Sequence, residues 1–222
     1  MTPAASSRCR PRTTRHSVVA LVVLCLAVQG TVGQEHHHGG SAPTPQASEA
    51  ASPLYTEDDL MFLTHMIMHH QQALDMAALV PARSHREEFI RFARYVDGAQ
   101  RAEIDQMNAL LRAAADRGLV APHHDMDGDP PMHGMLSKAQ MAALAAASGA
   151  QFERLWLQGM IYHHQGALDM SRAQQQRQFE TQRHPYGIDV LVDDILVTQR
   201  AEITKMRTWL TQWGLSGPAE AH

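Results

Sequence analysis

Histidine, methionine and glutamate recur at fixed spacings in two parts of the chain. Residues 66–76 read MIMHHQQALDM, and residues 160–170 read MIYHHQGALDM. Further along, residues 100–107 read QRAEIDQM and residues 199–206 read QRAEITKM. Imidazole, thioether and carboxylate groups all bind metal ions. The repeated spacing therefore predicts a metal site whose ligands come from both copies.

Helical periodicity predicts which of the histidines face inward. His69 and His163 each lie on an apolar seam of alternating four- and three-residue steps, the pattern of a helix packed in a bundle. His70 and His164 lie on the flank of the same apolar face. We therefore expect all four imidazoles at or near the core.

Glu103 and Glu202 fall on the seams of the partner helices, each three residues after a glutamine. Burying an unpaired carboxylate costs several kcal/mol, so each must meet a cation, a proton donor or a metal ion. The histidines of the facing helix are the nearest candidates by symmetry. The alternative is a buried Glu–His or Glu–Gln hydrogen-bond network that fixes the register of the helices without metal.

Methionine narrows the choice of metal to copper. Thioethers suit Cu(I), imidazole suits both Cu(I) and Cu(II), and zinc would gain little from methionine. Another transition metal stays possible. The predicted metal ligands are His69, His70, Met76, Glu103, Met107, His163, His164, Met170, Glu202 and Met206.

A histidine- and methionine-rich loop, HHDMDGDPPMHGM at 123–135, supplies further candidates. It could gather copper and pass it inward, or it could be an ordinary polar loop. Met66 and Met160 could equally be core residues without a metal role. The further candidate ligands are His65, Met66, Met160, His123, His124, Met126, Met132, His133 and Met135.

The elements that must position these residues are helices. Capping signals are Thr56 with Asp59, Ser84 with Glu87, Ser137 with Gln140, and Ser148 with Gln151, and Pro81 is expected to stop the first helix at Val80. The two motif copies then form two helical hairpins, and we expect an all-α, ferritin-like four-helix bundle with one short extra helix. The expected helices cover residues 56–80, 84–117, 137–147, 148–179 and 185–213.

The start of the chain is expected to be a signal peptide. Four arginines precede an apolar run at 18–28, and a small-residue stretch offers cleavage before Gln34. An uncleaved anchor is the alternative. Cys9 and Cys25 both lie in this segment, so the mature chain would lack thiolates. We expect a signal peptide at 1–33, a tether at 34–55 that begins near His36–His38, the helical domain at 56–215 and a tail at 216–222.

These motifs resemble a known family. The paired HHQ-x-AL-DM segments, and GMLS at 134–137 followed by KAQMAALAAASGAQF, are similar to the bacterial family of ferritin-like domains known as domain of unknown function 305. The resemblance covers about residues 55–214 and implies an exported helical protein, with copper binding or tolerance in some members. The family's paired histidines correspond to His69–His70 and His163–His164, and its recurring methionines to Met76 and Met170. Tyr162 stands where the first copy has Met68, so the halves need not bind metal equally.

The sequence thus favours an exported, non-enzymatic protein that binds, buffers or delivers copper. A net charge of −4 gives no electrostatic reason to expect nucleic acid as a partner, and no membrane span is expected after signal cleavage. A homodimer or a metal-donor protein could be its partner. The alternatives are a ferritin-like metal-dependent oxidase, for which the repeated carboxylates are few, and a structural or partner-binding bundle without metal.

Overall fold

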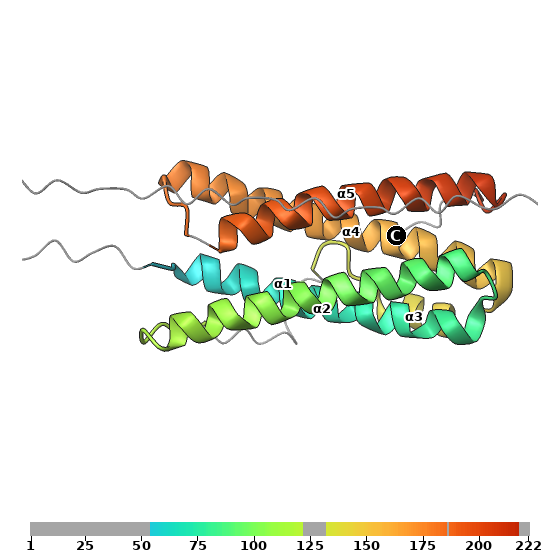
Figure 1. Ribbon diagram of the computed structural model, residues 1–222, viewed down its shortest axis with the longest axis horizontal. Coiled ribbons are helices and arrows are strands. Elements are labelled where there is room, and N and C mark those ends of the chain that lie inside the picture. Colours follow the sequence, from blue (N-terminus) through green and yellow to red (C-terminus); the bar gives the residue numbers. More distant parts are fainter. Residues whose placement is uncertain (1–53, 122–131, 186, 218–222) are drawn as a thin grey trace, which may run out of the picture. The chain divides into compact units, whose positions relative to one another are not determined.

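The computed structural model describes residues 54–121, 132–185 and 187–217. The chain divides into a unit of residues 1–49 and a unit of residues 50–222, and all described residues belong to the second. They form helices without strands, which confirms the all-α prediction. The helices are α1 (Glu57–Arg83), α2 (Glu87–Ala115), α3 (Lys138–Ala146), α4 (Gly149–Thr181) and α5 (Ile188–Gln212) (Figure 1).

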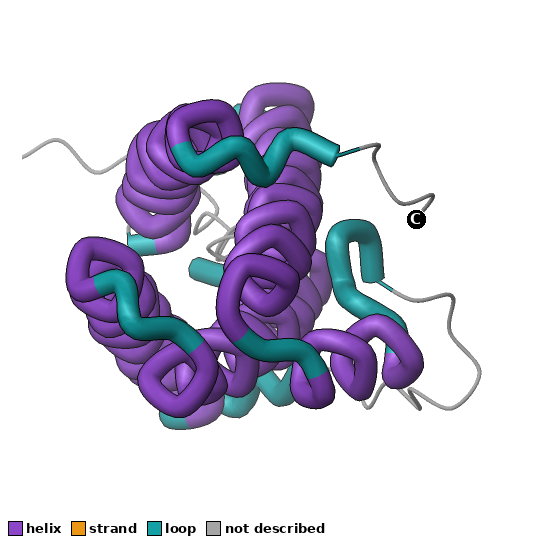
Figure 2. Tube along the Cα trace, turned by 90° about the vertical axis from the view of Figure 1, so that its right-hand side faces the viewer, coloured by secondary structure: helices purple, strands orange, loops and turns teal. Residues whose placement is uncertain are grey.

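The four long helices form two hairpins. α1 packs along α2, and α4 packs along α5 (Figure 1). The hairpins meet mainly through α1 and α4, whereas α2 and α5 touch only slightly. Figure 2, turned by 90° from Figure 1, shows the long helices nearly end-on. α1 and α4 run antiparallel, because Trp156 near the start of α4 donates to the carbonyl of Met76 in the second half of α1 at 2.9 Å. A long crossover that includes α3 therefore joins the hairpins.

Two of the predicted capping boxes are present. Thr56 accepts a hydrogen bond from the backbone of Asp59, whose carboxylate accepts one from Thr56. Ser137 and Gln140 make the same reciprocal pair at the start of α3. Each pair satisfies amide donors that have no partner inside a helix, which is why these two starts were predictable.

The predicted cap at Ser84 is wrong, and so is the predicted stop at Pro81. Ser148 is the N-cap residue of α4 but makes no side-chain capping hydrogen bond, so the pair predicted with Gln151 does not form. α2 begins at Glu87 with Arg86 as its N-cap, and α1 continues through Pro81 to Arg83. Ser84 instead donates to the buried carboxylate of Glu153 at 2.6 Å, and Arg86 donates to the same carboxylate at 2.8 Å. The buried charge of Glu153 requires both partners, and that tertiary requirement outweighs the local capping signal.

The crossover segment 132–137 docks against α1 and α4. Gln72 makes two hydrogen bonds to Leu136: its amide donates to the backbone carbonyl at 2.9 Å, and its carbonyl accepts from the backbone N–H at 2.7 Å. On α4, Gly166 lies against Gly134, whose φ of +88° suits glycine. Gln72 and Gly166 occupy matching places in the two motif copies, so the copies differ where one segment must bind both helices.

Replacing Gly166 with alanine should destabilise the protein. A Cβ there would lie 1.9 Å from the carbonyl oxygen of His133 and 2.6 Å from Cα of Gly134, so backbone must move. We expect G166A to lower the free energy of unfolding by about 1–3 kcal/mol in urea titrations, the usual range for overpacking. G98A is the matched control, because a Cβ on Gly98 in α2 has nothing within 4 Å and should stabilise the helix by about 0.5–1 kcal/mol. Equal stability of the two variants would contradict the close packing of segment 132–137.

Candidate metal centre

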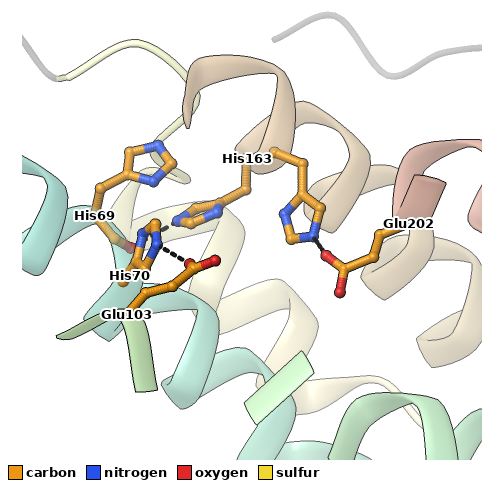
Figure 3. A network of polar contacts seen from close by, with 6 residues as sticks. His69, His70, Glu103, His163 and Glu202 are labelled. Carbon is orange, nitrogen blue, oxygen red and sulfur yellow. Dashed lines mark hydrogen bonds and ion pairs between the residues drawn. The ribbon is translucent and has the colours of Figure 1, made fainter. Parts of the chain in front are cut away.

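Four histidines lie at the contact between α1 and α4. His69 and His70 come from α1, and His163 and His164 come from α4; each is fully buried. The rings of His69 and His163 are neighbours across the contact, with centroids 3.8 Å apart (Figure 3). The structure therefore brings together the two histidine pairs that the seam pattern placed in the core.

Backbone carbonyls hold the Nε2 atoms of the central pair, His69 and His163. His69 Nε2 lies 3.2 Å from the carbonyl oxygen of His133, and His163 Nε2 lies 2.8 Å from the carbonyl oxygen of His69. A carbonyl only accepts, so both Nε2 atoms must carry hydrogen and donate. In the neutral ring this leaves Nδ1 with a free lone pair, which is the form that binds a metal ion.

Carboxylates hold the Nε2 atoms of the other pair, His70 and His164. His70 Nε2 lies 2.6 Å from a carboxylate oxygen of Glu103 on α2, and His164 Nε2 lies 2.6 Å from a carboxylate oxygen of Glu202 on α5 (Figure 3). The same interaction thus occurs once in each hairpin. A carboxylate behind an imidazole orients the ring and raises its basicity, as in many metal sites.

The four long helices also carry buried polar atoms without a hydrogen-bond partner. Nδ1 of all four histidines is buried without a hydrogen-bond partner. So are Oε1 of Gln100, both amide atoms of Gln199 and Oε1 of Glu202. Each such atom costs about 1–3 kcal/mol if nothing satisfies it. The four Nδ1 atoms at one helix contact therefore call for a bound ion or ordered water.

Burial keeps the central rings neutral. Burial, with a smaller contribution from the adjacent His70, lowers the pKa of His69 to about 3. Burial, followed by the nearby rings of His69 and His164, also lowers the pKa of His163 well below its ordinary value. Both imidazoles are therefore neutral at physiological pH, as metal coordination requires.

Within residues 54–121, 132–185 and 187–217, no group of three or more His, Asp and Glu side chains is arranged to hold a metal ion. An ion at the described histidines would therefore need other donors as well, and thioethers are the ones that the sequence supplies nearby. Met66 and Met160 each precede a central histidine by three residues, and both are fully buried. The donor chemistry fits a soft ion better than zinc or a carboxylate-bound iron pair.

The other predicted ligands are spread through the fold. Met76, Met107 and Met206 are fully buried, and Met170 is half-buried. His65, Met132 and Met135 are half-buried, whereas the exposed His133 pairs with Asp169 at 2.9 Å. Apart from its carbonyl on His69, His133 therefore lies outside the centre. His123, His124 and Met126 fall outside the described residues.

Two more residues are duplicated between the motif copies, Asp75 with Asp169 and Arg101 with Arg200, and their opposite charges would suit an interhelical ion pair. In the described residues, Arg101 and Asp169 pair differently. Arg101 pairs with Asp97 one turn earlier on α2, at 2.9 Å. Asp169 pairs with Arg172 on its own helix and with His133 of the crossover. Neighbours on the same helix supply the opposite charge, so no partner from across the bundle is needed.

The chain belongs to the family described as domain of unknown function (DUF305), whose model matches residues 59–210. A DUF305 protein from Streptomyces coelicolor, assigned as secreted, is 28% identical with a TM-score of 0.61, over 74% of this chain and 96% of its own. A DUF305 fragment from Deinococcus radiodurans is 32% identical with a TM-score of 0.60, over 71% of this chain and 97% of its own. No curated protein matches the chain.

A further relative is known with metal bound. CopM in its Cu(I)-bound form is 30% identical to this chain, with a TM-score of 0.53, over 72% of this chain and 98% of its own. CopM has also been solved in Cu(II)-bound and Ag-bound forms. None of the helices that the structure describes is long and apolar enough to cross a membrane.

Stability should fall in acid because of the two central histidines. Their folded-state pKa values lie below the ordinary value of 6.5, so the unfolded chain binds more protons below that pH. Their contribution to the free energy of unfolding is complete above pH 6.5 and is lost as the pH falls toward the folded-state pKa values. In metal-free protein we expect a slope of up to about 1.4 kcal/mol per pH unit for each histidine, measured between pH 6.5 and 5.

Replacing both histidines with glutamine, H69Q with H163Q, should flatten that slope. The exposed His85 on the turn before α2 gives the matched control, because H85Q changes a side chain that is solvated in both states. An unchanged slope in the double variant would show that the central rings are not held neutral by burial.

Proposed function

We propose that this protein binds copper outside the cytoplasm, to store, buffer or deliver it, through the histidines at the α1–α4 contact. The observation that carries the proposal is the set of four buried Nδ1 atoms without a partner, on rings whose Nε2 atoms are already held. Copper-bound and silver-bound structures of CopM support the choice of metal. The signal-like start of the sequence supports export.

The arrangement suits a binding protein because the four imidazoles are already oriented, with further donors needed to complete the coordination of an ion. Each ring is fixed by a carbonyl or a carboxylate, so little side-chain freedom is lost on coordination. The rings are nitrogen donors and the nearby methionines are soft thioether donors, a combination that favours a soft monovalent ion. We therefore expect Cu(I) to bind more tightly than Zn(II) or Fe(II).

Glu103 and Glu202 act in this proposal as positioning residues behind His70 and His164. Each carboxylate faces a ring nitrogen rather than the unpartnered Nδ1. They would hold the tautomer that leaves Nδ1 open, and they would stabilise positive charge as the ring binds the ion. This assigns them a different role from the direct ligands that the sequence predicted.

The two alternative functions have less support. A two-iron oxidase centre needs several carboxylates around one point, and in the described residues Glu103 and Glu202 each engage a different histidine. We also propose that the bundle is ferritin-like and that its two hairpins arose by duplication. A purely structural bundle would leave the buried Nδ1 atoms to ordered water, and metal titration separates that case from ours.

Copper titration of residues 34–222, the chain without the expected signal peptide, tests the proposal. Under anaerobic conditions with a Cu(I) competitor, we expect tight, saturable Cu(I) binding, with Zn(II) and Fe(II) binding weakly. The H69Q and H163Q double variant should lose the tight core binding, because glutamine can still donate to the carbonyls but has no ring nitrogen to offer. The surface variant H85Q should bind like the unaltered protein.

A copper affinity that is unchanged in the double variant, with native helical content by circular dichroism, would disprove the core site. Deleting residues 34–52, which contain His36–His38, should leave the tight binding in place. Loss of tight binding on that deletion would instead move the site to the tether.

Variants of the two glutamates separate a positioning role from direct ligation. We expect E103Q with E202Q to lower the Cu(I) affinity by about 10–100-fold, with the number of bound ions unchanged. The matched control is E87Q, whose side chain is 85% exposed at the start of α2. Competition titrations give the affinity, and elemental analysis gives the stoichiometry. A smaller number of bound ions would show that the carboxylates bind the metal directly.

A further inference from the structure

A small cavity opens between α1 and α4, on the side of the histidines toward the start of α1. Its volume is about 200 Å³. Met61 and His65 line it from α1, and Met170 lines it from α4. Asp58 and Arg177 lie at the same cavity, so its lining carries one charge of each sign.

The three donors line one cavity. Met61 and His65 are four residues apart on α1, a spacing that puts side chains on the same helix face about 5–6 Å apart at Cβ. Met170 reaches the cavity from the facing helix. Met61 and Met170 are half-buried, whereas the core methionines such as Met66 and Met160 are fully buried. Both thioether side chains therefore border the cavity, and Met170 also packs against the core.

The matching place in the other half of the protein shows that these donors are not required by packing. At the offset of 94 residues between the motif copies, Leu155 and Gly159 stand where the cavity has Met61 and His65. There the space is reduced to about 50 Å³ and α3 contributes to its wall. The methyl of Met76, the counterpart of Met170, lies 3.3 Å from where a Cβ on Gly159 would be.

Two of the three donors, Met61 and His65, thus occur only beside the larger cavity, whereas the third, Met170, has Met76 as its counterpart. Where α3 and the Met76 side chain fill the space, the equivalents are aliphatic or absent. Packing alone would favour the same small and apolar residues in both halves. Two thioethers and one imidazole are instead a donor set for a soft monovalent ion.

We propose that Met61, His65 and Met170 form a second, outer site for a soft monovalent metal ion, Cu(I) or Ag(I). Asp58 and Arg177 offset each other, so the lining does not repel such an ion. The inference rests on the proposed function only for the identity of the natural metal. Its ligands and its cavity are separate from the central histidines.

The outer site lies at the end of a row of donors that leads inward. Met61, His65 and His69 follow one another at four-residue steps along α1, so they form one ridge of the helix. On α4, Met170 lies two turns from His163. The residues of the outer site therefore lie one to two helical turns from the central histidines on both helices.

Silver binding followed at the methionine methyl groups tests this site. Ag(I) is used because it is soft, diamagnetic and stable in air, and the exported protein is labelled with ¹³C at its methionine methyls. We expect the resonances of Met61 and Met170 to shift as Ag(I) is added. M61L with M170L should bind one ion fewer, and M141L, a half-buried methionine of α3 outside the cavity, should bind as many as the unaltered protein.

The outcomes separate this site from the core. Methyl shifts that persist in H69Q with H163Q would establish the outer site as independent. Unmoved Met61 and Met170 resonances at saturating Ag(I), or a full complement of ions in M61L with M170L, would overturn it. If H69Q with H163Q binds as many Ag(I) ions as the unaltered protein, the core proposal is contradicted and the outer site is not affected. Because Met→Leu conserves volume, the variant is expected to fold.

Discussion

The burial of four imidazoles at one helix–helix contact is the constraint around which this fold is organised. A buried ring needs a partner for each nitrogen, and the rest of the chain is arranged to supply one for each Nε2. α2 and α5 bring Glu103 and Glu202 to His70 and His164, and the crossover brings the carbonyl of His133 to His69. The Nδ1 atoms have no such partner in the described residues, and this imbalance is the observation on which the proposed metal site rests.

The two hairpins are alike at the histidines and different around them. The crossover segment must lie on both α1 and α4, so Gln72 bonds Leu136 on one side while Gly166 makes room for Gly134 on the other. Tyr162, in place of Met68, lies beside the ring of His133. Both differences between the motif copies therefore occur on the face that receives the crossover. A protein built from two similar halves can bind one connecting segment only if the halves differ there.

Much of this arrangement could be predicted from the sequence. The histidine seams, the burial of Glu202 and two of the four predicted capping pairs follow from helical periodicity and local hydrogen bonding, which act over a few residues, whereas Glu103 is only half-buried. The cap at Ser84 was wrong because Glu153, far away in sequence, binds Ser84 and Arg86 instead. The carbonyl partner of His69 and the part played by Met61 were not predictable, since both depend on how the crossover and the facing helix pack. Position along a seam indicates burial but not which ring nitrogen is left open.

The protonation and metal response of the histidine nitrogens test the central claim most directly. ¹⁵N-detected NMR of the histidine side chains distinguishes a protonated Nε2 from a bare Nδ1, and it reports coordination at either atom. The account predicts that His69, His70, His163 and His164 carry hydrogen on Nε2 in the metal-free protein, and that Nδ1 of the central pair shifts when Cu(I) or Ag(I) binds. Protonated Nδ1 atoms, or nitrogen resonances that stay unmoved at saturating metal, would show that the buried histidines are structural and that the ion binds elsewhere.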